Sequence, residues 1–111
     1  MIHMTPNILC VDDEPVNLSL LQAVLIPNGY EVVKAGDGQK ALEILNEQRI
    51  DLVLLDVMMP RMDGFTVCRH IKENEKLRHI PVIMITGLTS TQERIKGIEA
   101  GAEDFISKPF D

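Results

Sequence analysis

Short apolar runs recur along the chain at similar intervals, with polar or mixed stretches between them. The five runs lie at Ile8–Val11, Glu31–Ala35, Leu52–Leu55, Val82–Ile85 and Asp104–Ser107. Near-continuous runs rich in β-branched residues are typical of strands that are covered on both faces of a sheet. The second run is more polar than the others, so it predicts an edge strand.

Helical spacing of apolar residues fills the intervals between these runs. The predicted stripes are Leu20, Leu21, Val24 and Leu25; then Ala41, Leu42, Ile44 and Leu45; then Phe65, Cys68 and Ile71; then Ile95 and Ile98. The boundary signals are Pro15 and Asn28-Gly29 for the first helix, Asp37-Gly38 for the second, Asp63 for the third, and Ser90–Glu93 with Gly101 for the fourth. These are residues that begin or end helices through capping and left-handed turns.

Strands therefore alternate with helices throughout residues 1–111, which predicts a single doubly wound α/β domain with a parallel sheet. Met1–Met4 precede the first strand and are set aside as a leader. A further helix is expected to cover the last strand, yet the sequence stops at Asp111. We therefore expect the chain to be a fragment of a longer protein.

Charged and polar residues follow the apolar runs at the positions where ligands bind in such sheets. Asp12, Asp13, Asp56, Thr86 and Lys108 each lie at or just past the carboxyl end of a predicted strand. Three carboxylates at one edge repel one another unless a cation lies among them, and their oxygens suit Mg²⁺. A metal beside a carboxylate and a lysine is typical of phosphoryl transfer.

Simpler interpretations exist for each of these residues. Asp12 and Asp13 could favour a helix N-terminus through its dipole, and Asp56 or Thr86 could simply end a strand. Lys108 taken alone would be a solvated lysine. Other residues are interpreted structurally: Asp63-Gly64 as a turn, His3, His70 and His79 as surface or satisfied histidines, Met58, Met59, Met62 and Met84 as packing residues, and Lys72–Arg78 as a solvated stretch.

Composition narrows the class of protein. The net charge of −6 disfavours nucleic-acid binding within these residues and adhesion to anionic membranes. Cys10 and Cys68 lie in apolar patterns without a metal-binding or redox spacing, so buried, reduced thiols are expected. No signal peptide or membrane span is recognisable, which predicts a cytoplasmic protein.

From Asn7 to Phe110 the chain resembles the receiver domain of two-component response regulators, the CheY-like family. The matching motifs are Val11–Glu14, Leu54–Pro60, Met62–Gly64, Ile85–Gly87, Gly101-Ala102 and Lys108–Phe110. Each motif is weak by itself, but together, in this order and at strand ends, they are specific. The resemblance implies a flavodoxin-like five-stranded sheet in the order 2-1-3-4-5, with the last helix of that fold missing from this sequence.

The resemblance also implies the chemistry of the site. Asp56 is the expected phosphoacceptor, receiving a phosphoryl group from a phosphohistidine of a sensor kinase. Asp13 and Asp56 are expected to bind Mg²⁺ directly, or Mn²⁺ in its place, with Asp12 acting partly through water. Met58 is expected to offer its backbone carbonyl to the metal.

Further roles come from the same resemblance. Thr86 is expected to hydrogen-bond the phosphoryl group and Lys108 to pair with it. The Lys108-Pro109 peptide bond is expected to be cis. Phe105 matches the switch aromatic of the family, where many members carry tyrosine. The surface around Ile95, Lys96, Phe105 and Ile106 is our expectation for the output face.

The expected function is a switch domain that phosphorylates and dephosphorylates itself and acts on no external substrate. Its partners would be a sensor histidine kinase or phosphotransfer protein, an effector domain beyond Asp111, and a homodimer as one allowed assembly. Met58–Phe65 and Glu93–Ala102 resemble receivers fused to cyclic-di-GMP enzymes, but receivers fused to histidine kinases and stand-alone receivers have much the same pattern, and a DNA-binding domain beyond Asp111 is also open. Two alternatives remain: a phosphohydrolase with an aspartyl-phosphate intermediate, and a receiver-shaped interaction domain that is not phosphorylated.

Overall fold

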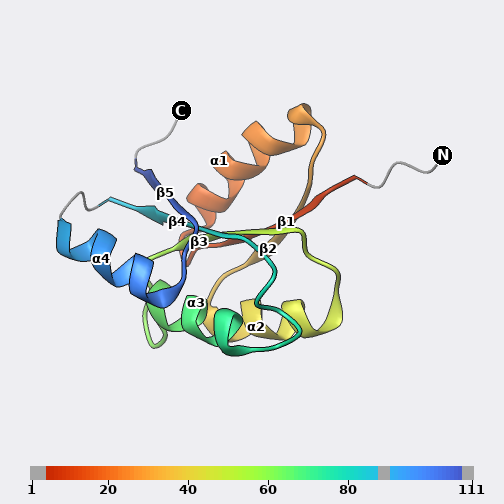
Figure 1. Cartoon of the computed structure of the whole chain (residues 1–111). Coiled ribbons are helices and arrows are strands. Elements are labelled where there is room, and N and C mark those ends of the chain that lie inside the picture. The colour runs from red at the N-terminus through yellow and green to blue at the C-terminus, as the bar shows by residue number, and fades with distance from the viewer. Residues whose placement is uncertain (1–4, 88–90, 109–111) are drawn as a thin grey trace.

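A single parallel sheet of five strands forms the centre of the molecule. The computed structural model describes residues 5–87 and 91–108. The strands are β1 (Asn7–Val11), β2 (Glu31–Ala35), β3 (Leu52–Asp56), β4 (Val82–Thr86) and β5 (Asp104–Ser107), in the order β2-β1-β3-β4-β5 (Figure 1). All neighbouring strands pair in parallel. The predicted strand order is confirmed, and Asn7, Asp56 and Thr86 extend the predicted strands by one residue each.

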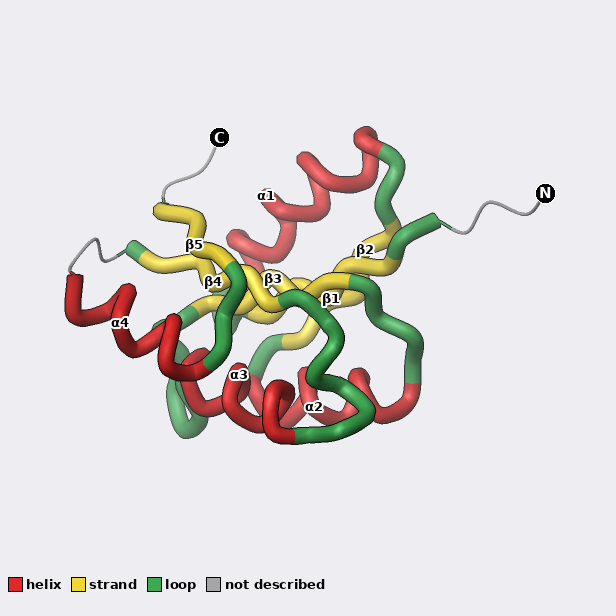
Figure 2. The backbone as a smooth tube through the Cα atoms, viewed as in Figure 1, coloured by secondary structure: helices red, strands yellow, loops and turns green. Residues whose placement is uncertain are grey.

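Helices cover both faces of this sheet. They are α1 (Pro15–Leu25), followed by the 3₁₀ turn η1 (Ile26–Asn28), then α2 (Gly38–Glu47), α3 (Gly64–Glu73) and α4 (Thr91–Ala100). Helix α1 lies on one side of the sheet, and α2, α3 and α4 lie on the other (Figures 1 and 2). The predicted doubly wound architecture is therefore confirmed, and β5 is the last element of the described part of the chain. None of the described helices is long and apolar enough to cross a membrane.

Most of the predicted boundary signals have the expected geometry. The Asp37 side chain accepts a hydrogen bond of 2.7 Å from the Lys40 amide at the start of α2. Asp63 accepts one of 2.9 Å from the Thr66 amide at the start of α3. Gly29 and Gly101 have φ angles of 93° and 99°, as a left-handed helix stop requires. Ser90, and with it the first residue of the predicted capping box, lies outside the described residues, as does Pro109.

The core has two parts, one on each face of the sheet. The larger cluster lies under α2, α3 and α4 and includes Val53, Leu55 and Met84, while the smaller one lies under α1. Cys10 and Cys68 are buried free thiols, as predicted. Burial raises the pKa of the two thiols, to about 12 for Cys10 and about 11 for Cys68.

The predicted apolar stripe of α1 is partly wrong, and that of α4 is wrong. In α1 the buried residues are Leu18 and Leu21, whereas Leu20 and Val24 are exposed. In α4 both Ile95 and Ile98 are exposed. The apolar residues of these helices outnumber the positions that face the sheet, so helical spacing alone does not show which of them are covered.

The interpretation of Lys72 as part of a solvated stretch is also wrong. Its Nζ donates to the carbonyl oxygens of Arg78 and Ile80 at 3.2 and 2.7 Å, and to the Glu103 carboxylate. The other oxygen of Glu103 accepts from the Val82 amide. Lys72 therefore ties the end of α3 to the beginning of β4 and the approach to β5.

Candidate functional site

The predicted site residues meet at the carboxyl edge of the sheet. Asp12 directly follows β1, Asp56 and Thr86 are the last residues of β3 and β4, and Lys108 directly follows β5. Backbone hydrogen bonds continue past the strand ends: the Lys108 amide donates to the Thr86 carbonyl at 2.8 Å, and the Asp12 amide to the Ala35 carbonyl at 3.1 Å. The sheet therefore holds these residues on rigid backbone rather than on free loops.

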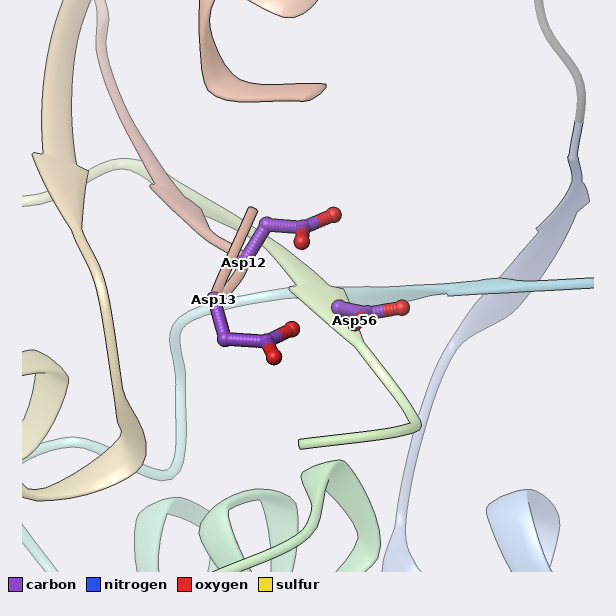
Figure 3. Close-up of side chains that lie close together, drawn as sticks. All are labelled: Asp12, Asp13 and Asp56. Atoms are coloured by element: carbon purple, nitrogen blue, oxygen red, sulfur yellow. The ribbon is translucent and has the colours of Figure 1, made fainter. Parts of the chain in front are cut away.

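Three carboxylates form the acidic cluster of this edge: Asp12, Asp13 and Asp56. Each offers an oxygen, and these oxygens lie within 4.8 Å of one another (Figure 3). Asp12 and Asp56 are only 1% and 3% exposed, whereas Asp13 is exposed. Two buried like charges with a third beside them cost free energy unless a cation compensates them.

Lys108 supplies part of this compensation. Its Nζ donates to Asp56 Oδ1 at 2.9 Å and lies 3.4 Å from Asp12 Oδ2. Burial alone lowers the pKa of the ammonium, but hydrogen bonding and attraction to the two carboxylates outweigh it and raise the pKa of Lys108. The lysine is therefore charged at neutral pH, and the interpretation of it as a solvated surface residue is wrong.

Asp56 itself lies in an unfavourable place for a carboxylate. Burial is the largest influence and raises its pKa, the hydrogen bond from Lys108 opposes it, and the charge of Asp12 raises it further. Desolvation therefore outweighs the lysine in setting the pKa of this carboxyl. A second cation at the acidic cluster would restore the balance of charge.

The oxygens available at the cluster fit a hard divalent metal. Asp12 Oδ1 accepts from the Glu14 amide at 2.9 Å, but the buried Asp12 Oδ2 has no hydrogen-bond partner among the described residues. Its nearest charged partner is the Lys108 ammonium at 3.4 Å, and buried polar atoms usually have closer partners, so a carboxylate oxygen in this position beside two other carboxylates is available to a metal ligand shell. An all-oxygen donor set is what Mg²⁺ prefers, and it keeps several waters of its own.

A depression of about 310 Å³ opens over this cluster. It is lined by Asp13, Glu14, Asp56, Met58, Gly87 and Lys108. Met58 is 64% exposed, so the interpretation of this methionine as a packing residue is wrong, whereas Met59 and Met84 are buried as predicted. Asp56 lines this depression although its side chain is almost fully covered.

Gly64 has a role at the site that sequence reasoning missed. A Cβ at this position would lie 2.9 Å from the Val57 Cα and still closer to the Asp56 carbonyl oxygen. The Gly64 amide also donates to the Val57 carbonyl at 2.9 Å. Only glycine lets α3 begin this close to the end of β3, which the turn pattern at Asp63-Gly64 did not reveal.

Thr86 and Phe105 lie on the same face of the sheet. Thr86 is buried and pairs in register with Ser107, and Phe105 pairs with Met84, two residues before Thr86. Residues two apart on a strand share a face, and so do register partners of parallel strands. The ring of Phe105 is therefore next to the strand that carries Thr86, on the side covered by α4.

A family model describes this combination of fold and site. The model for the response regulator receiver domain matches residues 8–111. The chain is 51% identical over 108 residues to the response regulator PleD of Caulobacter vibrioides, and 42% identical over 106 residues to the DNA-binding dual master transcriptional regulator RpaA of Synechocystis. These matches cover 97% and 96% of this chain, but only 24% and 44% of the two relatives.

Solved structures agree with the fold. The chemotaxis protein CheY4 of Vibrio cholerae superposes with a TM-score of 0.93 at 31% identity, over 97% of this chain and 90% of that one. The receiver domain of the sensor histidine kinase PA1611 from Pseudomonas aeruginosa, solved with a magnesium ion in its active site cleft, gives 0.88 at 34% identity, over 97% and 88%. This chain therefore belongs to the response regulator receiver domain family.

Proposed function

We propose that the chain is a phosphoacceptor switch domain of two-component signalling, with Asp56 as the acceptor and Mg²⁺ as the required metal. The observation that carries this proposal is the contact of Lys108 with Asp56, 2.9 Å long, inside a cluster of three carboxylates. A buried carboxylate with a raised pKa, one cation partner and an open approach has the features of a reactive group, because perturbed carboxylates cluster at functional sites.

The proposed reaction transfers a phosphoryl group from a phosphohistidine of a sensor kinase or phosphotransfer protein. An Asp56 carboxylate oxygen forms the new O–P bond as the P–N bond of the donor breaks, and the electron pair of that bond stays with the imidazole. Attack by water later breaks the O–P bond and returns the carboxylate, so the domain acts on no external metabolite. Positioning and charge neutralisation supply most of the catalysis in such transfers.

Four groups would hold Mg²⁺, or Mn²⁺ in its place. Asp13, Asp56 and the Met58 carbonyl would bind it directly, and Asp12 would bind it partly through water. The bound metal would shield the carboxylates from the incoming phosphoryl charge. The buried Asp12 oxygen, which accepts no hydrogen bond from the described residues and has Lys108 only at 3.4 Å, and the raised pKa of Asp56 support this donor set. The receiver domain of PA1611 has its magnesium ion in the corresponding kind of cleft.

Lys108 and Thr86 would respond to the new charge. Lys108 already contacts Asp56, so its ammonium can pair with an added phosphoryl oxygen without moving to another part of the site. The Thr86 hydroxyl would donate to the same group, and this bond would exist only in the phosphorylated state. Phe105, on the same face as Thr86, would then change its position as the switch aromatic.

The signal would pass to an effector domain of the same polypeptide or to a separate partner. PleD and RpaA are both much longer than the segment they share with this chain. We propose that the full protein acts in the cytoplasm, and that the surface around Ile95, Lys96, Phe105 and Ile106 is its output face, which a second copy of the domain is also able to use. Ile95 and Ile106 are exposed, as such a face requires.

Phosphorylation by acetyl phosphate, followed by intact mass measurement, tests the acceptor. The wild-type chain should gain the mass of one phosphoryl group with Mg²⁺ and none with EDTA, and Asp56→Asn should gain none. Asp63→Asn is the matched control, because Asn replaces Asp well as a helix cap and Asp63 lies outside the acidic cluster. It should behave like the wild type.

Two results would contradict the proposal. A mass gain that persists in Asp56→Asn would place the phosphoryl group elsewhere. No gain in a folded chain that binds Mg²⁺ would favour an interaction domain that is not phosphorylated. Continuous turnover of a generic phosphate ester such as p-nitrophenyl phosphate would instead support the phosphohydrolase alternative.

A further inference from the structure

A glycine lies in the interior of α4 where the fold offers no turn to explain it. Gly97 is buried within the helix Thr91–Ala100. Glycine in the middle of a helix lowers the equilibrium constant for folding about four- to fivefold relative to alanine. The residue must therefore supply something that a Cβ would remove.

The ring of Phe105 occupies the space of that missing side chain. A Cβ on Gly97 would lie well inside 3.0 Å of two ring atoms of Phe105, Cε1 and Cζ, and 3.3 Å from the sulfur of Met84. Real Cβ atoms do not approach other atoms so closely. The edge of the Phe105 ring therefore inserts into a notch in α4 that exists only because residue 97 has no side chain.

Arg94, in the preceding turn of α4, also contacts the Phe105 ring. Its guanidinium lies 5.7 Å from the centroid of the Phe105 ring. Positions three apart lie on the same side of a helix, so Arg94 and Gly97 face the ring together. A cation over an aromatic face is attracted to it, which favours the inserted position of the ring.

Few side chains of α4 are buried in the described part of the chain. Its buried residues are Gly97 and Ala100, and the Ala100 carbonyl accepts a hydrogen bond of 3.3 Å from the Cys68 thiol of α3. The larger apolar residues of α4, Ile95 and Ile98, are exposed. Elements with few buried apolar contacts open and shift more easily than the core, so the inserted ring is a main determinant of where α4 lies.

We propose that Gly97 is the positioning residue for the Phe105 ring, and that Gly97 and Arg94 together form a receptacle that couples the ring to the position of α4. The part of this inference that concerns signalling rests on the proposed function, because it needs phosphorylation of Asp56 to act through Thr86 on the same face of the sheet. Departure of the ring from the receptacle would release α4, and a side chain at residue 97 would keep the ring out permanently.

A double-mutant cycle in urea tests the receptacle without any phosphorylation. Gly97→Ala in the wild-type background should lower the folding equilibrium constant roughly 5- to 150-fold, as overpacking does. In a Phe105→Ala background the same change should raise it, by up to four- to fivefold, because the helix propensity of alanine is then opposed only by the 3.3 Å contact with the Met84 sulfur. An equal effect of Gly97→Ala in the two backgrounds would overturn the proposal.

The cycle also decides the case in which Gly97→Ala alone does not fold. Folding restored by Phe105→Ala would support the receptacle, because the clash needs both side chains. A double variant that remains unfolded would refute it.

A fluorine label on the ring tests the signalling part. The phenylalanines are replaced by 4-fluorophenylalanine, and the resonance of residue 105 is assigned with Phe105→Leu. In the wild type, acetyl phosphate with Mg²⁺ should shift this resonance. In Gly97→Ala the resonance should already be shifted before phosphorylation and should change less than half as much afterwards, although the intact mass gain is the same.

Glu99→Ala is the control, because it adds helix propensity at an exposed position of α4 to which no role is assigned. It should leave both the resonance and its response unchanged. A response of Gly97→Ala equal to that of the wild type would overturn the inference. No mass gain in the wild type would refute the proposed function instead, and the urea cycle would still decide whether the receptacle exists.

Discussion

Replacing the proposed acceptor should make the metal-free protein more stable. Asp56→Asn keeps the shape of a side chain that is 3% exposed and removes one of the three charges of the acidic cluster. Most substitutions of buried residues destabilise a protein, so an increase in stability would be a specific consequence of the charge arrangement.

The magnitude follows from the distances. Carboxylate oxygens within 4.8 Å repel by at least ~3.5 kcal/mol per pair at an effective dielectric constant of about 20, and Asp56 takes part in two such pairs. Its attraction to Lys108 at 2.9 Å is ~5.7 kcal/mol on the same basis. The charges therefore leave a net repulsion of ~1 kcal/mol on Asp56 in the wild type. The variant also avoids the cost of burying a carboxylate, which stabilises it further. We expect a gain on the order of 1–3 kcal/mol.

Urea unfolding at pH 7 and low ionic strength, with EDTA, measures this gain. The control is Glu75→Gln, which makes the same chemical change at an exposed position and should alter the free energy of unfolding by less than ~0.5 kcal/mol. Addition of Mg²⁺ should reduce or reverse the difference in the free energy of unfolding between Asp56→Asn and the wild type. The reason is that a metal at a hundredfold excess over its Kd stabilises the wild type by ~2.7 kcal/mol. The variant, with one ligand fewer, should gain less.

The pH dependence provides a second check of the same reasoning. The pKa of Asp56 is raised in the folded protein, so its ionised form opposes folding above that pKa. As the pH falls through the folded pKa, the carboxyl binds a proton and the penalty disappears. The stability difference between Asp56→Asn and the wild type should therefore shrink in acid. A variant that is less stable than the wild type at pH 7 in EDTA would refute this account of the site.

Three further predictions concern packing, capping and thiols. Gly64→Ala should lower the free energy of unfolding by ~1–3 kcal/mol in urea, because its Cβ meets backbone, whereas Gly36→Ala, with open space around it, should not. Asp63→Ala should cost ~1 kcal/mol and Asp63→Asn far less, since asparagine also caps a helix. Cys10 and Cys68, with pKa values of about 12 and about 11, should react with DTNB at pH 8 only as fast as the protein opens, and an immediate reaction of the native protein would contradict their burial.

The sequence was a reliable guide where physical constraints are local or repeat along the chain. Runs such as Leu52–Leu55 and Val82–Ile85 form central strands as predicted, because only a sheet covered on both faces suits them. The caps at Asp37 and Asp63 need only a side-chain oxygen and an amide three residues later, and both form. Gly101 ends α4 for an equally local reason.

Helix faces were less predictable. Leu20 and Val24 have the same helical spacing as covered residues, but α1 rests on the sheet through Leu18 and Leu21. Which apolar residues of a helix are buried depends on how the helix packs on the strands beneath it. Lys72 shows the same limit for a polar residue, because its three acceptors lie on Arg78, Ile80 and Glu103.

At the site, the sequence alone determined which chemical groups are present and that each ends a strand: Asp12, Asp56, Thr86 and Lys108. Their convergence follows from parallel strands, whose carboxyl ends share one edge. Only the tertiary structure decided how they interact: Lys108 lies 2.9 Å from Asp56, one buried oxygen of Asp12 lacks a hydrogen bond among the described residues, and burial raises the pKa of Asp56. The physical reason is that the strength of an electrostatic interaction depends on distance and on exclusion of water, and both arise from contacts between residues far apart in the sequence.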